Sequence, residues 1–377
     1  MKFNAKLKVS APKSPTAASG KALAVIINQK MKRLLFLITI FSFNLNFGQN
    51  NLSEIYGNWI KYKVEMKDGS KLFDRFIEDS TYIEYSIDKQ KLCLNSNPIH
   101  KTNESCLDYT LINNFIKTSQ YSGLLIEKIT NDTLIFSEKI DGLTNDKLKR
   151  FYFKRQELVL SKFNEENKNK KNIIASKLFT PKTNSTIEIE LNKAFKNNFS
   201  NFELIGNLKI YPKEKSVKTQ ITFSTQKDSS RIRTIKKIID SSFEKWDLTN
   251  FNGFESIELP IILKSEITNR YWGIKVLFFT NDLNEFEIVY GGKLEDMRKS
   301  SELFEKGIKS YQEKKYLKAI EFFTESYRID PKNIDALYNK AAIYFESGDK
   351  ENACIVWKEI SELGQVNGKE LYQNNCN

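Results

Sequence analysis

Two consecutive stretches near the C-terminus match each other at a fixed shift that places Leu303 on Leu337, and this repeat constrains the fold more than any other feature of the sequence. The first stretch is SSELFEKGIKSYQEKKYLKAIEFFTESYRIDPKN, and the second is IDALYNKAAIYFESGDKENACIVWKEISELG. Small residues and aromatic residues recur at equivalent positions of both stretches. Because one such unit cannot bury its apolar face alone, the repeat predicts paired helices that stack on their neighbours.

This pattern resembles the tetratricopeptide repeat (TPR) family, in which an Ala-x3-aromatic pair and a junction proline recur with the same period. A small residue lets two helices approach closely, and a proline cannot continue the preceding helix. The residues expected to build the fold are Leu303, Gly307, Ala319, Phe323, Pro331, Leu337, Ala341, Ala353 and Trp357. Polar residues occupy three positions that are usually apolar in the family, Lys306, Ser310 and Lys340. The first repeat is therefore expected either to be distorted or to pack on its neighbour.

The TPR resemblance also implies a function for the inner faces of the helices. In this family the first helices of successive repeats line a groove that holds peptides or partner proteins. By position, that face consists of Phe304, Ile308, Tyr311, Tyr338, Ala342 and Phe345. Such an aromatic stripe suits the capture of a helix or a strand; the alternative is that these residues pack against the middle domain. Since two repeats bury little surface, a capping helix is expected over Gly368 to Cys376.

The segment MKRLLFLITIFSFNLNFGQN, Met31 to Asn50, has the layout of a cleavable secretory signal. Lys32 and Arg33 precede an apolar block that is much shorter than the roughly 20 residues of a membrane-spanning helix. The segment resembles signal peptides of Bacteroidetes, which implies a signal over residues 31–48 and a mature N-terminus at Gln49. The alternative is a short buried helix. We expect a periplasmic or secreted protein with no retained membrane span.

Residues 1–30 are rich in Lys, Ala, Ser and Pro and contain no acidic residue. A segment of this composition cannot bury enough apolar surface to fold, so it is expected to be a disordered extension or a mis-annotated start upstream of Met31. The whole chain carries a charge of +12, but residues 1–48 hold eight lysines and arginines and no acid, which leaves +4. This mild charge argues against nucleic-acid binding.

The chain contains four cysteines, Cys93, Cys106, Cys354 and Cys376. An even number in an exported chain favours two disulfides, and the pairs expected are Cys93 with Cys106 and Cys354 with Cys376. The alternative is four buried free thiols. The cysteines lack the short Cys-x-x-Cys spacing of zinc and redox sites, so no metal site is predicted.

Residues 52–160 contain short stretches rich in Ile, Tyr, Phe and Val that polar turns separate. Many short strands at regular spacing predict an antiparallel barrel or sandwich. The opening Gly57-Asn58-Trp59 resembles the G-x-W motif of lipocalins. That resemblance implies that Trp59 closes the floor of a barrel and that the cavity holds a small apolar molecule. The alternative is a barrel that its own side chains fill.

Residues 161–183 include the polar run NEENKNKKN and are expected to form a solvated linker. In residues 184–292, Phe202–Tyr211 and Val217–Phe223 alternate as two strands, and Ser230–Trp246 has helical spacing. Further strands are expected in IELPIIL, GIKVLFF and FEIVY. This β-β-α-β order resembles the C-terminal domain of TonB-type energy transducers. A transducer needs a retained anchor and a Pro-rich spacer, and neither is apparent in the sequence.

The predicted fold is thus a multidomain α+β protein. It combines a β-barrel or sandwich at 52–160, a β-β-α-β module at 184–292, and a TPR pair with a capping helix at 300–377. The single histidine, His100, lies in a polar stretch and is expected on the surface. No catalytic, metal or cofactor site is predicted. We expect an exported, non-enzymatic scaffold that binds a protein through the TPR groove. The alternatives are a carrier of a small lipophilic ligand in the barrel and a TonB-like envelope component.

Overall fold

The computed structural model describes residues 52–74, 76–101, 104–184, 186–196, 198–267, 272–290 and 292–376. The chain from Asn51 onward forms one compact unit. The expected extension at 1–30, the expected signal at 31–48 and the expected mature start at Gln49 lie outside the described residues.

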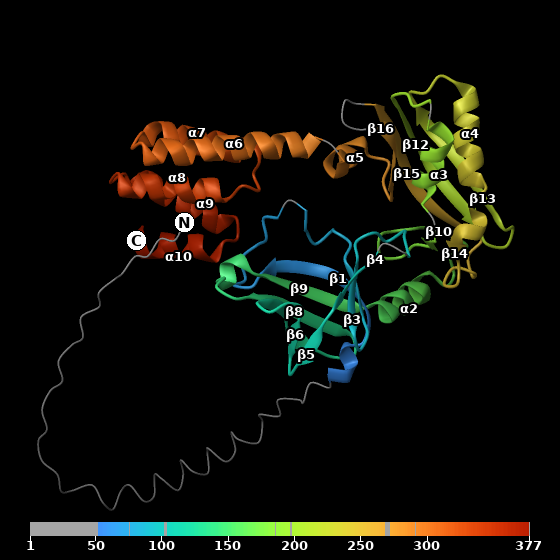
Figure 1. Cartoon of the computed structure of the whole chain (residues 1–377), viewed down its shortest axis with the longest axis horizontal. Coiled ribbons are helices and arrows are strands. Elements are labelled where there is room, and N and C mark those ends of the chain that lie inside the picture. Colours follow the sequence, from blue (N-terminus) through green and yellow to red (C-terminus); the bar gives the residue numbers. More distant parts are fainter. Residues whose placement is uncertain are drawn as a thin grey trace, which may run out of the picture. The chain divides into compact units, whose positions relative to one another are not determined.

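The first part is an antiparallel sheet that is nearly closed into a barrel (Figure 1). Its strands are β1 (Gly57–Met66), β2 (Glu84–Ile87), β3 (Lys91–Asn95), β4 (Glu104–Asp108), β5 (Thr110–Ile112), β6 (Phe115–Lys117), β7 (Ser122–Ile129), β8 (Thr133–Ile140) and β9 (Lys149–Arg155). The short helices η1 (Leu52–Ile55) and η2 (Asn145–Lys147) precede β1 and β9. The strand order is β4-β3-β2-β1-β9-β8-β7-β6-β5. Since only Tyr109 separates β4 from β5, one bent stretch of chain supplies both ends of the sheet. The coarse prediction of an antiparallel barrel is therefore confirmed.

Alternation along the strands gives the barrel its apolar interior. In β9, Phe151 and Phe153 are buried, whereas Tyr152 between them is only partly buried. Successive side chains of a strand point to opposite faces, so this pattern places one face inside the barrel. A buried cluster in the barrel includes Trp59, Ile126, Leu134 and both of these phenylalanines.

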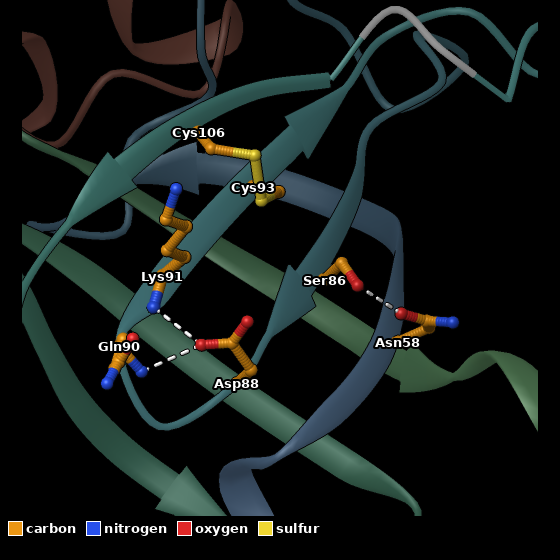
Figure 2. Close-up of a disulfide and its surroundings, with 7 residues drawn as sticks. All are labelled: Asn58, Ser86, Asp88, Gln90, Lys91, Cys93 and Cys106. Carbon is orange, nitrogen blue, oxygen red and sulfur yellow. Dashed lines mark hydrogen bonds between the residues drawn. A yellow bond between two sulfur atoms is a disulfide. The ribbon is translucent and has the colours of Figure 1, made fainter.

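A disulfide ties two neighbouring strands of the barrel (Figure 2). Cys93 of β3 and Cys106 of β4 are direct partners in the strand register, and their Cα atoms lie 4.0 Å apart. In the turn before β3, the carboxylate of Asp88 accepts hydrogen bonds from the backbone N–H groups of Gln90 and Lys91, both at 2.7 Å. The second expected disulfide, Cys354 with Cys376, is also present.

The middle part is a mixed sheet with helices packed on it (Figure 1). Its elements are α2 (Gln156–Asn167), β10 (Asn172–Ile174), β11 (Lys182–Thr183), α3 (Ile187–Phe195), β12 (Phe202–Tyr211), β13 (Ser216–Ser224), α4 (Ser229–Asp240), η3 (Phe243–Lys245), β14 (Trp246–Asp247), β15 (Ser256–Ile267) and β16 (Trp272–Phe278). Strand β12 lies between β13 and β15, while β10 and β16 both pair with β15. The expected order of two strands, a helix and a strand is present as β12, β13, α4 and β15. Buried side chains of α3 and α4 join the core beneath the sheet.

The segment 161–183, expected to be a solvated linker, is largely part of the fold. Helix α2 extends to Asn167, and β10 pairs in parallel with β15. The Phe163 ring of α2 stacks on the Phe179 ring at a centroid distance of 3.5 Å. The polar run occupies the end of α2 and the turn after it, while apolar residues on both sides are buried or partly buried in the core.

Two further expectations in the middle part are wrong. The helix predicted over Ser230–Trp246 ends at Asp240, and Trp246 belongs to β14, with its indole N–H donating to Ser242 Oγ at 3.0 Å. The sequence FEIVY, predicted as a strand, lies in helix α5 (Leu283–Tyr290). In that helix Phe286 and Tyr290 are four residues apart, and their ring centroids lie 4.7 Å apart. A spacing of four brings side chains together on a helix, and this contact overrides the alternation.

His100 is buried, contrary to the expectation of a surface position, with 6% of its surface exposed. It lies in the loop after β3, which reaches into the middle part: Ile99 joins the core of that part, and Thr183 N–H donates to the Ile99 carbonyl at 2.7 Å. The Asn95 side chain donates to the His100 carbonyl at 3.1 Å. Burial lowers the pKa of His100, so the imidazole is held neutral.

The C-terminal part consists of helices that contact one another in chain order (Figure 1). They are α6 (Gly292–Gln312), α7 (Tyr316–Ile329), α8 (Asp335–Glu346), α9 (Lys350–Glu362) and α10 (Val366–Asn375). Helices α6 and α8 end at equivalent positions of the two repeats, and helices α7 and α9 begin at equivalent positions. The period of the sequence is thus also the period of these helix boundaries.

Most of the residues expected to build this helical fold lie in its interior. The buried ones are Gly307, Ala319, Phe323, Leu337, Ala341, Ala353 and Trp357. Leu303 is half-buried, and Pro331 is exposed in the turn before α8. A Cβ atom on Gly307 would lie 2.7 Å from the Phe323 ring, so only glycine fits where α6 meets α7. Ser310, one of the polar departures from the family pattern, is buried.

Candidate partner-binding groove

A cavity of about 550 Å³ opens between the last helices of the chain. We call it the groove, and its lining residues are Tyr338, Asn339, Ala342, Phe345, Glu346, Trp357, Leu371 and Asn375. The first five come from α8, Trp357 comes from α9, and the last two come from α10. The groove is thus built by the second repeat and by the helix that caps it.

The spacing of residues along α8 explains which of its side chains form one wall of the groove. Tyr338, Ala342 and Phe345 are four and three residues apart, so they share one face of the helix. The small Ala342 between the two aromatic residues leaves room for an incoming side chain. Phe345 is 44% exposed, and its ring centroid lies 5.1 Å from that of the buried Trp357. An exposed aromatic ring supported by a buried one provides a rigid apolar surface.

The opposite wall depends on how α10 is held against α9. Gly368 of α10 lies so close to α9 that a Cβ atom there would be 2.4 Å from Ile360 Cγ2. At the other end of α10, the disulfide between Cys354 and Cys376 joins the two helices, with the Cα atoms 5.6 Å apart. These two attachments position Leu371, which lines the groove between them.

The six residues that the sequence predicts for the groove lie in different surroundings in the two repeats. Tyr338, Ala342 and Phe345 line this cavity. Phe304, Ile308 and Tyr311 of the first repeat are instead half-buried against a cluster formed by α6, α7 and α8. This packing differs from both expectations, because these side chains neither line the groove nor join the core of the middle part.

Contacts of the first repeat explain why its aromatic residues do not line the groove. The Phe304 ring packs on Phe323, with ring centroids 5.3 Å apart. The Tyr311 hydroxyl donates to Glu346 Oε2 at 2.7 Å, which ties α6 to the end of α8. The first repeat therefore supports the groove from the side.

Sequence reasoning misses part of the site. The repeat pattern assigns Trp357 only to packing, although this residue also lines the groove. Leu371 and Asn375 belong to the expected capping helix, to which the sequence assigns no binding role. Their spacing of four residues places both on one face of α10, and this is the signal that could have identified them.

A second cavity of about 650 Å³ adjoins the groove, and Tyr338 lines both. We call it the rim cavity, because its other wall is a barrel segment, formed by Met66, Asp68, residues 70–74 and Phe76, together with residues around η2. Burial raises the pKa of Tyr338 to about 12; the Gly368 backbone N–H opposes this shift, and the negative charges of Asp68, Asp335 and Asp146 add to it. The tyrosine is therefore a neutral hydrogen-bonding group at physiological pH.

Hydrogen bonds fasten the barrel segment to the helices at two positions one repeat apart. Lys332, in the turn before α8, donates to the Asp74 carbonyl at 2.9 Å and forms an ion pair with Glu78. Val366, at the equivalent position one repeat later and at the start of α10, donates its N–H to Ser70 Oγ at 3.0 Å. Two positions one repeat apart thus contact one stretch of the barrel.

The Gly57-Asn58-Trp59 motif at the start of β1 has a structural role in the barrel. Trp59 is fully buried, and its indole N–H donates to the Ile55 carbonyl at 2.8 Å. The Arg155 guanidinium stacks on the Trp59 ring 4.3 Å from its centroid and donates to the carbonyl oxygens of Glu54, Tyr56 and Asn131. Gly57 has a φ of +127°, and a Cβ atom there would lie 2.8 Å from Arg155 Nη1. Contact with Arg155 therefore explains why a residue without a side chain stands at position 57 and an aromatic ring at position 59.

Aromatic side chains occupy the interior of the barrel where the lipocalin resemblance places a ligand. Tyr85 packs on Phe153 and on Phe136, with centroid distances of 5.2 and 6.2 Å, and the two phenylalanines lie 5.7 Å apart. Both phenylalanines are fully buried. This packing favours the alternative of a barrel filled by its own side chains.

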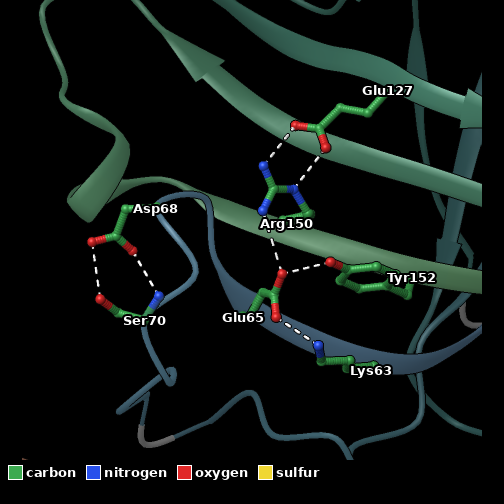
Figure 3. A network of polar contacts seen from close by, with 7 residues as sticks. All are labelled: Lys63, Glu65, Asp68, Ser70, Glu127, Arg150 and Tyr152. Atoms are coloured by element: carbon green, nitrogen blue, oxygen red, sulfur yellow. Dashed lines mark hydrogen bonds and ion pairs between the residues drawn. The ribbon is translucent and has the colours of Figure 1, made fainter. Parts of the chain in front are cut away.

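Charged residues of β1, β7 and β9 form an internally paired network (Figure 3). Arg150 donates through Nε to Glu127 at 2.6 Å and through Nη1 to Glu65 at 3.3 Å. Glu65 also accepts hydrogen bonds from Lys63 and Tyr152, and the net effect is to lower its pKa even though burial opposes this. Because these charges pair with one another across three strands, the network supports the sheet.

Within the described residues, no three His, Cys, Asp or Glu side chains are grouped as a metal site would require. No helix in this part of the chain is both long enough and apolar enough to cross a membrane. The two disulfides fit an oxidising compartment outside the cytoplasm. No family model matches the sequence, and no curated protein matches it either.

Proposed function

We propose that this chain is an exported, non-enzymatic binding protein whose C-terminal helices form a TPR-type domain that holds a short apolar segment of a partner protein. The observation that carries this proposal is the groove, where Phe345 is exposed and rests on the buried Trp357. Large exposed aromatic residues in a concave, mostly apolar site are typical of positions that contribute strongly to binding. The period that the sequence shares with the helix boundaries supports the TPR interpretation.

The test is a selection of peptides that does not require a known partner. A random-peptide phage library is panned against the full chain, and the enriched peptides are measured by fluorescence anisotropy. We expect Phe345→Ala to weaken their binding at least about tenfold, which corresponds to about 1.4 kcal/mol. The matched control is Ile355→Ala, because Ile355 is 59% exposed on α9 but does not line the groove.

Each result of this selection has a definite meaning. Loss of binding in the Phe345 variant with full binding in the Ile355 variant supports the proposal, provided that both variants keep the wild-type melting temperature. Peptides that bind both variants and the wild type equally would contradict it. A Phe345→Leu variant preserves an apolar side chain and is expected to lose less affinity than Phe345→Ala.

The alternatives rest on weaker support. A carrier of a small lipophilic molecule requires space inside the barrel, where Tyr85, Phe136 and Phe153 pack together. A TonB-like envelope component requires an N-terminal anchor that remains attached. Sequencing of the mature N-terminus separates this alternative from our proposal, since a start at Gln49 would exclude a retained anchor.

A further inference from the structure

The disulfide between Cys93 and Cys106 lies on the outer surface of the barrel (Figure 2). In β3, Leu92 is buried in the barrel core and Leu94 packs against that core, so the side chain of Cys93 between them points outward. Ser86, the register partner of Cys93 on β2, forms an exposed hydrogen bond of 2.6 Å with a side chain of β1. Cys106, the register partner on β4, is itself exposed. The disulfide therefore faces solvent.

Within the described residues, β4 is attached to the barrel mainly through its pairing with β3 and through this disulfide. It lies at one end of the sheet, where β3 is its neighbour. The side chains from Ser105 to Asp108 are all exposed. Leu107 stands opposite the buried Leu92 in the register, yet 53% of its surface is exposed. Burial in the core therefore contributes little to holding β4.

The residue that follows β4 is fastened separately. The Tyr109 hydroxyl donates to the Asp88 carbonyl at 2.6 Å, and the Tyr109 N–H donates to the Gln90 carbonyl at 3.2 Å. The Tyr109 ring also packs against the barrel core. These contacts join Tyr109 to the turn between β2 and β3 without involving β4. Loss of the disulfide should therefore affect β4 and leave this anchor in place.

The other disulfide of the chain is better covered. Cys354 and Cys376 both pack against the buried cluster formed by α8 and α9. Both are partly buried, whereas Cys106 is exposed. Thiol–disulfide exchange requires that an attacking thiolate reach one sulfur atom of the bond. The barrel disulfide is therefore the more accessible of the two to a reductant.

We propose that Cys106 is a site of thiol–disulfide exchange with a dithiol reductant, and that reduction of its bond to Cys93 releases β4 while the rest of the chain stays folded. A thiolate of the dithiol attacks Cys106 Sγ, the bond to Cys93 breaks, and Cys93 leaves as a thiolate that takes up a proton. The second thiol of the dithiol then attacks its own partner sulfur and frees Cys106. Two electrons and two protons pass to the cysteines, and the dithiol becomes a disulfide. This proposal is independent of the groove.

The rates of reduction test the exchange site. The full chain is incubated under native conditions with reduced dithiothreitol, quenched at intervals with iodoacetamide, and digested for mass spectrometry. Cys93 and Cys106 should be labelled at least about tenfold faster than Cys354 and Cys376. The attacked sulfur is identified with two single variants. The Cys106 thiol of Cys93→Ser should react faster with an added aromatic disulfide than the Cys93 thiol of Cys106→Ser.

Hydrogen exchange tests the release of β4. In the Cys93→Ser, Cys106→Ser variant, and in the wild type after selective reduction, amides of β4 should exchange at least about tenfold faster than in the oxidised wild type. Amides of β9, in the middle of the sheet, should be unchanged. The matched control is Cys354→Ser, Cys376→Ser, in which exchange in β4 should equal that of the wild type.

Each part of the proposal can be contradicted. Equal rates of reduction, or earlier reduction of Cys354–Cys376, would overturn the exchange site. Faster reaction of Cys93 than of Cys106 would overturn the assignment of the attacked sulfur. If β4 keeps its protection after reduction, the disulfide does not hold the strand. If β9 loses protection together with β4, reduction unfolds the barrel as a whole, and the release of one strand is also contradicted.

Discussion

The rings of Phe345 and Trp357 lie 5.1 Å apart between centroids, and one is exposed while the other is buried. The two residues come from α8 and α9 of the same repeat. A packed pair of this kind keeps the exposed ring in one position, so the Phe345 side chain loses little additional conformational entropy when a partner binds. This relationship connects the repeat fold to the proposed binding function.

Substituting Gly307 by alanine should destabilise the helical part. The new Cβ atom would lie 2.7 Å from the Phe323 ring, so the ring or the helix must move. We expect a loss of about 1–3 kcal/mol in the free energy of unfolding, measured by urea denaturation. Gly253→Ala is the control, because a Cβ atom there meets nothing within 4 Å. Equal effects of the two substitutions would contradict the close packing of α6 on α7.

Substituting Arg155 by alanine should destabilise the barrel. The change removes the cation over the Trp59 ring and leaves the Glu54 and Tyr56 carbonyls without their donor. A loss of about 1–2 kcal/mol is expected, since two part-buried carbonyls lose their donor and the ring loses its cation. Trp59 fluorescence should change in the same variant. Arg233→Ala, at an exposed position of α4, should leave stability within about 0.5 kcal/mol of the wild type.

The stability of the chain should fall as the pH drops below about 6.5 because of His100. Burial lowers the pKa of His100 in the folded state, so the unfolded chain takes up a proton first as the pH falls. The contribution of His100 is fully present above its ordinary pKa of about 6.5 and is lost progressively below it. Since the sequence contains a single histidine, His100→Gln should flatten the pH dependence in this range. The free energy of unfolding is measured by chemical denaturation at several pH values. If its pH dependence is the same in His100→Gln as in the wild type, burial of the imidazole is contradicted.

Removing the disulfide between Cys354 and Cys376 should loosen α10. The disulfide spans 22 residues and fastens the end of the chain, so the Cys354→Ser, Cys376→Ser variant is expected to lose about 3 kcal/mol in the chain-entropy view. Hydrogen exchange should accelerate in α10 and much less in α6, which the disulfide does not join. Replacing Cys93 and Cys106 instead should leave exchange in α10 unchanged.

The parts of the fold that could be predicted depend on local periodicity. The repeat places the buried Gly307, Ala319 and Phe323 correctly because small and aromatic residues at fixed spacing determine how paired helices meet. The antiparallel barrel follows from short stretches rich in Ile, Tyr, Phe and Val that polar turns separate. The disulfide pairs follow from cysteine number and proximity in sequence.

The parts that could not be predicted depend on contacts between distant residues. Helix α5 replaces an expected strand because Phe286 packs on Tyr290 and is almost completely buried. Phe304 occupies an expected groove position but packs on Phe323, and spacing alone does not show which side chain fills a gap between helices. The rim cavity is lined by residues of both the barrel and the helices. These residues are far apart in the sequence, so no local pattern predicts the cavity.

The most direct measurement of the central claim is site-specific photocrosslinking in the native host. A benzophenone amino acid is placed at position 339 in the groove, and in a separate variant at position 355 on the exposed face of α9. We predict a discrete crosslinked protein from position 339 that is absent from position 355 and is lost when Phe345→Ala is added. The same adduct from both positions, an adduct that persists with Phe345→Ala, or no adduct at position 339 would contradict the groove as the binding site.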